Sequence, residues 1–205
     1  MSDVILVTGF EPYAEHRANP SMDVAKSLDG RRVGGDVVRA AVLPVHHVEA
    51  AWRVAALLDE HEPRAVLHLG LAPGRSRIAL ERVAVNVMDF PLPDAAGYVA
   101  HDEPCVIDGP AAYFSTLPLA TILAALLAED IPAYVSSTAG TYLCNQTLYT
   151  TLHRLAAAPW PAVAGFVHLP LAPAMVAQSG QDLPSLDVSL AVRAVEIALA
   201  VIAEG

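Results

Sequence analysis

The sequence predicts an α/β fold in three layers, with a mostly parallel, twisted sheet between two layers of helices. Short apolar runs rich in β-branched residues alternate with segments whose apolar residues recur at helical spacing. Strands and helices that alternate in this way are typical of a parallel sheet covered on both faces. The 205 residues show neither an internal repeat nor a linker, so we expect a single domain over residues 1–205.

The first half of the chain opens with an expected strand that is soon followed by an expected helix. The run VILVTGF (4–10) is apolar and β-branched, which predicts a buried strand. The run SMDVAKSL (21–28) predicts a short helix with Ser21 as its N-cap. The other elements expected in this half are a strand at 36–45, an amphipathic helix at 48–61, an apolar strand at 64–70, and one strand or a bent pair of strands at 76–87.

The second half begins with a section, 91–116, that is rich in Pro, Gly and Asp. It has little periodicity, so we expect loops and a short hairpin there. The alternation then resumes, with helices at 117–130, 141–157 and 185–204 and strands at 131–138 and 162–170. Because ligands gather outside the carboxyl ends of parallel strands, we expect a site at the ends of these strands.

The composition excludes two classes of partner, nucleic acids and membranes. The formal net charge is −10 and the 12 Lys and Arg residues are scattered, whereas a nucleic-acid binder normally carries a basic patch. The longest apolar runs, 122–128 and 197–203, end at glutamates and fall well short of the about 18 residues that span a bilayer. The start of the chain lacks the basic region of a secretory signal, which predicts a cytoplasmic protein.

The cysteines and histidines form no metal-binding pattern. The chain has 2 cysteines, Cys105 and Cys144, whose spacing matches no zinc motif, and a cytosolic setting disfavours a disulfide between them. None of the 8 histidines forms an HxxxH or HExxH pair. His46 and His47 are adjacent, and neighbours on a strand point to opposite faces, so we expect no metal site.

Three residues lie where a reaction could be built. Cys144 follows an expected strand by a glycine turn and opens a helix, where unpaired N–H groups and the helix dipole favour the thiolate. His168 closes the next strand, where its imidazole could take the thiol proton, and Glu81 is a lone acid in an apolar strand that could orient the ring. The residues alone also allow a buried apolar cysteine, a core histidine, and a solvent-facing Glu81 paired with Arg77 or Arg82.

Four blocks of the chain carry a family resemblance. VTGFEPYAEHRANPS (7–21) is similar to the opening signature of the pyroglutamyl peptidases, and LHLGLAPGRSRIALERVAVN (67–86) to their glutamate signature. SSTAGTYLCNQTLY (136–149) and GFVHLP (165–170) are similar to the cysteine and histidine signatures. The chain therefore resembles this family of cytosolic cysteine peptidases, also called pyrrolidone carboxyl peptidases, nearly end to end.

The resemblance implies an activity and a role for each residue. It implies removal of N-terminal pyroglutamate from peptides, with Cys144 as the nucleophile, His168 as base and then acid, and Glu81 as the residue that orients His168. It also implies a homo-oligomer, commonly a tetramer, that needs neither a metal nor a cofactor. The positions that match the family's substrate pocket are Phe10, Tyr13, Asn19, Leu71, Leu92, Tyr142 and Leu143.

Departures from the family pattern keep two other functions open. Leu71 stands where glutamine is common, with Pro73 in place of a glycine. Phe90-Pro91 stands where many members carry an arginine, and Tyr13 replaces a common phenylalanine. The alternatives are a cysteine amidohydrolase that acts on another small cyclic amide, and a catalytically silent α/β small-molecule binder. The intact cysteine, histidine and glutamate positions argue against the silent binder.

Overall fold

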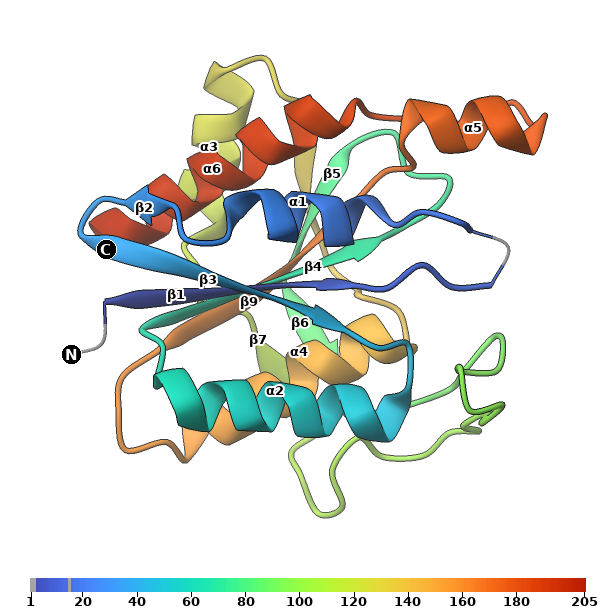
Figure 1. The fold of residues 1–205 in the computed structure, drawn as a ribbon. Coiled ribbons are helices and arrows are strands. Elements are labelled where there is room, and N and C mark those ends of the chain that lie inside the picture. Colours follow the sequence, from blue (N-terminus) through green and yellow to red (C-terminus); the bar gives the residue numbers. More distant parts are fainter. Residues whose placement is uncertain (1–2, 15) are drawn as a thin grey trace.

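The computed structural model describes residues 3–14 and 16–205 and has the predicted α/β architecture (Figure 1). Among these residues a 7-stranded sheet has the order β2-β3-β1-β4-β9-β5-β8, and a separate 2-stranded ribbon pairs β6 with β7. The strands are β1 (Val4–Phe10), β2 (Arg32–Val33), β3 (Asp36–Leu43), β4 (Ala65–Leu71), β5 (Ile78–Glu81), β6 (Val83–Val85), β7 (Ala112–Phe114), β8 (Ala133–Ser136) and β9 (Val163–Leu169). The helices are α1 (Pro20–Leu28), α2 (His47–His61), α3 (Leu119–Ala128), α4 (Leu143–Ala156), α5 (Pro173–Ser179) and α6 (Val188–Glu204).

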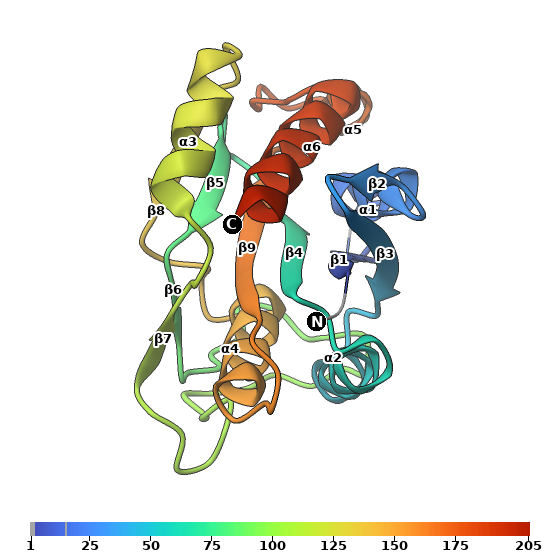
Figure 2. The same ribbon diagram turned by 90° about the vertical axis from the view of Figure 1, so that its left-hand side faces the viewer.

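Helices cover both faces of the sheet, as the sequence predicts. Figure 2 shows α1, α3 and α6 on one face and α2 and α4 on the other. Each face has its own apolar core, in which Leu126 and Leu199 pack on the first face and Leu58 and Leu148 on the second. Because both faces are covered, every residue of β1 after Val4 is buried.

Most neighbouring strands run parallel, but the direction changes between β9 and β5. β1 is parallel to both β3 and β4, and β4 is parallel to β9. β5 is antiparallel to β9 and parallel to β8. β5 lies between β8 and β9, so the strand before Cys144 and the strand that ends at His168 are not neighbouring parallel strands, contrary to the expectation from their order in the chain.

Residues 76–87 form two strands, β5 and β6, which flank Arg82, so the alternative of a bent pair is the one observed. Other elements differ from the expectation in their bounds or pairing. The ribbon partner of β6 is β7, so the strand inside section 91–116 pairs with earlier residues and the expected hairpin there is wrong. The N-cap of α1 is Asn19 rather than Ser21, since the Asn19 side chain accepts the N–H of Ser21 at 3.1 Å. Helix α5 was not expected, because it has no buried residues and therefore no apolar face to detect.

The loops that build a site gather at one end of the sheet. In Figure 1 the connections after β1 and β4 and the start of α5 after β9 all lie at the same end. This is the carboxyl end of the three central parallel strands, where a ligand site is expected. Within the described ranges, none of the helices is long and apolar enough to cross a membrane.

Candidate active site

Cys144 is the second residue of α4, at the position that the sequence predicts. The turn before the helix contains Gly140 at φ +80°, a conformation that glycine adopts without strain. A Cβ atom added to Gly70 would lie 3.0 Å from the Sγ atom of Cys144 and 2.7 Å from the ring of Phe166. The thiol therefore packs against the bare end of β4, which only a glycine leaves open.

Glu81 and His168 form a buried hydrogen bond between two antiparallel strands. Glu81 pairs with Phe166 on β9, and His168 lies two residues further along the same face. Nδ1 of His168 is 2.8 Å from Oε1 of Glu81, and the two side chains are 5% and 0% exposed. A carboxylate only accepts hydrogen bonds, so Nδ1 carries the proton and Nε2 is the basic nitrogen. The solvent-facing alternative for Glu81 is therefore wrong.

The structure brings Cys144 and His168 to the same strand end without joining them. His168 is the register partner of Gly70, the residue against which Sγ packs. Among the hydrogen bonds of the described residues, none links Sγ to the imidazole. Hydrogen bonds between a nucleophile and its base are often long in the free protein and tighten when substrate binds.

Arg75 completes this group and was missed in the sequence analysis. Its Nη1 donates to Oε1 of Glu81 at 2.6 Å, so one carboxylate oxygen binds both Arg75 and His168. Its Nη2 donates to the carbonyl oxygen of Thr138 at 3.4 Å, in the loop that leads to α4. The guanidinium therefore connects the acid to the segment that carries the thiol.

The two arginines that flank Glu81 in the sequence have other surroundings. The guanidinium of Arg77 lies over the ring of Tyr134, 4.6 Å from its centroid, and Arg82 is exposed. Arg75 reaches the acid because a turn with Gly74 at φ +83° folds the chain back before β5 begins. The Pro73-Gly74 dipeptide signals a turn but not which group the next side chain contacts, so spacing along the strand could not identify the partner.

Burial keeps the thiol and the imidazole neutral at rest. It raises the pKa of the Cys144 thiol to about 12, and the charge of Glu81 adds to this effect. Burial also lowers the pKa of His168, against the opposing hydrogen bond and charge of Glu81. Burial alone would raise the pKa of Glu81. The hydrogen bond and the charge of His168 are the largest opposing effects, and the pKa of Glu81 stays below its usual value. Desolvation is the largest effect on the thiol and acts against the acidity that a helix start was expected to give Cys144.

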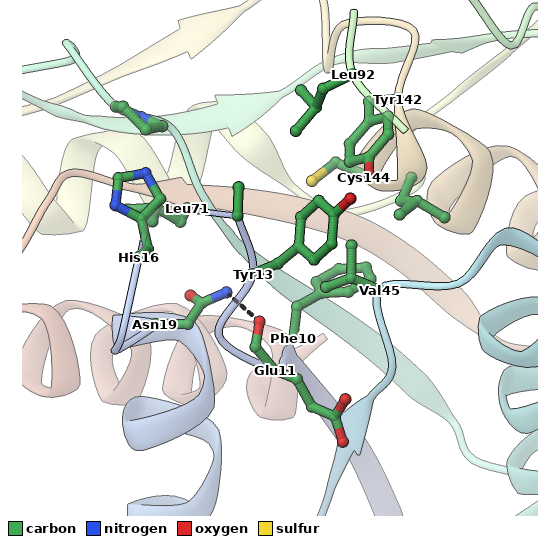
Figure 3. Close-up of a pocket in the computed structure, with 13 residues that line it drawn as sticks. Phe10, Glu11, Tyr13, His16, Asn19, Val45, Leu71, Leu92, Tyr142 and Cys144 are labelled. Carbon is green, nitrogen blue, oxygen red and sulfur yellow. Dashed lines mark hydrogen bonds between the residues drawn. The ribbon is translucent and has the colours of Figure 1, made fainter. Parts of the chain in front are cut away.

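A cavity of about 320 Å³ opens beside the thiol (Figure 3). The pocket residues predicted from the sequence all line it: Phe10, Tyr13, Asn19, Leu71, Leu92, Tyr142 and Leu143. Further lining residues that were missed are Glu11, Ala14, His16, Val45 and Pro73. They lie in the loops after β1, β3 and β4, where the sequence has no regular pattern that would show which way a side chain points. The wall around Cys144 is mainly aromatic and aliphatic, which suits a small, flat, uncharged ligand.

Two tyrosines join opposite walls of this cavity. The hydroxyls of Tyr13 and Tyr142 both donate to the carbonyl oxygen of Pro93, the Tyr142 bond being 3.1 Å long. Phe90 is buried and packs edge-on against Tyr142, with ring centroids 4.7 Å apart. The hydroxyl of Tyr13 therefore ties the first loop to the loop that carries Leu92, and Phe90 supports the wall from behind.

Asn19 lines the cavity, but its amide is used inside the first loop. Nδ2 donates to the carbonyl oxygen of Glu11 at 3.1 Å, as Figure 3 shows. Oδ1 accepts from both the N–H and the hydroxyl of Ser21, at 3.1 and 2.8 Å. Asn19 therefore fixes the shape of the loop. In Figure 3 the carboxylate of Glu11 points away from Cys144 and from the cavity.

Asp94 anchors the loop on the far side of the cavity. Its Oδ2 accepts from the N–H and Nδ1 of His47, at 3.0 and 2.6 Å. Burial alone would raise the pKa of Asp94. The hydrogen bonds from His47 are the largest opposing effects, and together with others they lower this pKa to about 2. The carboxylate thus stays ionised and holds the loop at neutral pH.

The same Asp94 forms, with His46 and His47, a cluster that could hold a metal ion, its ligand atoms all within 4.8 Å. The two imidazoles stack, with centroids 5.4 Å apart, because His46 caps α2 and His47 begins it. The expectation that these rings point to opposite faces is therefore wrong. Nδ1 of His46 already accepts from the N–H of Val48 at 3.2 Å, and Nδ1 of His47 is bound to Asp94, so the cluster serves as a hydrogen-bonded cap.

The chain is similar to known peptidases over nearly its whole length. The family model for pyroglutamyl peptidases matches residues 3–205. The pyrrolidone-carboxylate peptidase of Pyrococcus furiosus is 42% identical over 203 residues, which cover 98% of this chain and 98% of the relative. The corresponding protein of Deinococcus radiodurans is 45% identical over 199 residues, which cover 95% of this chain and 91% of that protein. A solved structure of the Pyrococcus furiosus pyrrolidone carboxyl peptidase superposes with a TM-score of 0.96 at 42% identity and covers 98% of both chains.

Proposed function

The chain belongs to the pyroglutamyl peptidase family, and on this premise we propose how its own residues remove pyroglutamate from the N-terminus of a peptide. In this proposal Cys144 is the nucleophile, His168 is the base and then the acid, and Glu81 orients His168. The observation that carries it is the buried Glu81–His168 hydrogen bond of 2.8 Å at the strand end against which Cys144 packs.

The cavity fits the shape and charge of a pyroglutamyl group. The lactam is a flat, uncharged five-membered ring, and the rings of Phe10 and Tyr13 give it aromatic walls. A prolyl or glutamyl N-terminus would bring an ammonium group into the same space. Glu11 is the acid in the wall, and its carboxylate points away (Figure 3), so that ammonium would lose its water without a partner. Removing water from an unpaired ion costs several kcal/mol in real proteins.

The first half of the reaction forms a thioester. Nε2 of His168 takes the proton from Sγ of Cys144, and the sulfur attacks the carbonyl carbon of the pyroglutamyl residue. The carbonyl oxygen becomes negative in the tetrahedral intermediate, and the first-turn N–H groups of α4 stabilise it. His168 then gives its proton to the leaving amine, the C–N bond breaks, and the shortened peptide departs.

The second half releases pyroglutamate. A water molecule takes the place of the amine, His168 accepts one of its protons, and the oxygen attacks the thioester carbonyl. The C–S bond breaks, and the proton returns from His168 to Sγ. Glu81 remains ionised throughout and stabilises the imidazolium through Nδ1.

We also propose the setting in which the enzyme acts. The family resemblance supports one peptidase domain over residues 1–205 that works in the cytoplasm without a metal or a cofactor. It also supports a homo-oligomer, with a tetramer as the expected state. The side chains of Ile107 and Phe114 are 79% and 70% exposed, which supports section 91–116 as part of an interface between subunits.

The test of this function compares fluorogenic amides of pyroglutamate, proline and glutamate. We expect the pyroglutamyl amide to exceed the prolyl amide by at least ~100-fold in kcat/KM, equivalent to about 2.7 kcal/mol in transition-state stabilisation. The prolyl amide is the matched control because it keeps the ring size, adds the charge and lacks the lactam carbonyl. Comparable values of kcat/KM on these two amides would contradict the proposed pocket.

A further inference from the structure

Arg75 and His168 bind the same oxygen of a fully buried carboxylate. Nη1 of Arg75 lies 2.6 Å from Oε1 of Glu81, and Nδ1 of His168 lies 2.8 Å from the same atom. The side chain of Glu81 is 0% exposed, whereas that of Arg75 is 26% exposed. The arginine therefore reaches in from the surface to an acid that water does not reach, and the mechanism above gives it no role.

We propose that Arg75 is a positioning residue that neutralises Glu81 and thereby permits the proton to pass from Cys144 to His168. The inference rests on the proposed function of Cys144, His168 and Glu81. It concerns what allows their proton transfer inside a buried site, and it assigns Arg75 no contact with the substrate.

The charges of the buried group balance when Arg75 is present. With Arg75 present, ionised Glu81 and the guanidinium sum to zero while the thiol and the imidazole are neutral. Proton transfer creates one thiolate and one imidazolium, so the sum stays at zero. Without the guanidinium the sum would be −1 before and after the transfer, so the thiolate would form in a site that holds an excess negative charge, and a low dielectric opposes this.

The direction of the pKa shift at the thiol agrees with this count, whereas at His168 the guanidinium opposes proton uptake and Glu81 offsets that effect. Burial is the largest cause of the high pKa of Cys144, Glu81 raises it further, and the charge of Arg75 opposes both. Burial is likewise the largest cause of the low pKa of His168. Glu81 raises this pKa, and the charge of Arg75 lowers it further. The titratable and charged groups that act on His168 are thus Glu81 from β5 and Arg75 from the loop after β4, with Cys144 on α4 beside them.

A second contact gives Arg75 a geometric role. Nη2 donates to the carbonyl oxygen of Thr138, which lies between β8 and the helix that carries Cys144. The backbone N–H of Arg75 donates to the carbonyl oxygen of Ala72 at 3.3 Å and closes the turn that presents the side chain. One guanidinium therefore fixes the acid and restrains the loop before the nucleophile.

The test replaces the charge of Arg75 while keeping a hydrogen-bond donor. In Arg75→Gln the pKa of His168 should rise, because Arg75 lowers it in the native protein. Neutral His168 then appears only at higher pH, so the acidic limb of the kcat/KM profile on the pyroglutamyl amide should move up by about one pH unit. We expect kcat near neutral pH to fall by about 10- to 100-fold with little change in KM, and Arg75→Lys to restore the native limb.

The control is Arg77→Met, which removes a guanidinium from the same segment. This guanidinium lies over the ring of Tyr134 and does not bind Glu81. Its pH profile should match that of the native enzyme. An unshifted acidic limb with kcat within twofold in Arg75→Gln would overturn the proposal, and so would a change confined to KM. Should Arg75→Gln fail to fold by circular dichroism, Arg75→Lys decides, because a limb displaced upward in that variant contradicts a role based on charge.

A substrate-free measurement separates this inference from the proposed function. The alkylation rate of Cys144 by iodoacetamide near neutral pH should fall at least about threefold in Arg75→Gln, since Arg75 lowers the pKa of that thiol. Failure of the native enzyme to hydrolyse the pyroglutamyl amide would refute the function and leave this comparison intact. Equal alkylation rates in the native protein and in Arg75→Gln would refute the role of Arg75 alone.

Discussion

The chain has 2 cysteines, Cys105 and Cys144, and burial raises the pKa of both thiols to about 12. Their surroundings differ. Sγ of Cys105 lies between the carbonyl oxygen of Val85 and the amide nitrogen of Asn145, at 3.7 and 3.8 Å, in the section between β6 and β7. Cys144 opens a helix, lines the cavity and packs against Gly70, the register partner of His168.

Acidity at rest does not distinguish the two thiols, because burial raises the pKa of both to about the same value. A thiolate is required for attack, and neither cysteine holds one near neutral pH. Cys144 differs because Arg75, Glu81 and His168 form a chain of contacts beside it, and in the proposed function this chain provides the base that makes the thiolate. Cys105 has a carbonyl and an amide as neighbours, and neither group accepts a proton at neutral pH.

The largest expected effect comes from changing the nucleophile. We expect Cys144→Ser to lower kcat on the pyroglutamyl amide by at least ~10³-fold, because a hydroxyl is far less acidic than a thiol and this base cannot activate it. Cys105→Ser is the matched control and should keep kcat within about twofold. Circular dichroism should show an intact fold in both variants. Turnover of Cys144→Ser within tenfold of the native rate would remove the distinction between the two cysteines.

A smaller but graded effect is expected at the base and its orienting acid. His168→Ala should lower kcat by about 10²- to 10⁴-fold, since it removes the group that moves the proton. Glu81→Gln should cost less, because the amide oxygen can still accept from Nδ1 while its charge is lost. Steady-state kinetics on both variants decide the order. A larger loss in Glu81→Gln than in His168→Ala would mean that the acid takes part in the chemistry itself.

The sequence predicted the layers of the fold well and the direction of the strands poorly. Apolar periodicity reports which segments are strands and helices, and the predicted alternation matches the observed elements from β1 to α6 apart from β2, β7 and α5. Periodicity does not report strand direction, so the reversal at β5 and β8 was not foreseen. Glu81 reaches His168 because of that reversal, through a diagonal contact between antiparallel strands.

The candidate catalytic residues could likewise be found from local sequence patterns, but their contacts with distant parts of the chain could not. The sequence allowed His168 to be an ordinary core histidine, and the structure contains such a residue in His68. His68 is bound by the hydroxyls of Thr8 and Thr151, at 2.7 and 2.9 Å, and burial lowers its pKa to about 3. His168 instead faces a carboxylate. Only the partners, which come from distant parts of the chain, distinguish the two residues, and Arg75 was missed for the same reason.

The most direct test of the central claim follows alkylation of the two cysteines and the loss of activity together. Sub-stoichiometric iodoacetamide near neutral pH should modify Cys144 at least about tenfold faster than Cys105, because an adjacent histidine can take the thiol proton. Peptide mass spectrometry measures the modified fraction at each cysteine, and hydrolysis of the pyroglutamyl amide measures the remaining activity. Activity should fall in proportion to the fraction of Cys144 that is modified. Activity that persists when Cys144 is fully modified, or that follows the modification of Cys105, would contradict it.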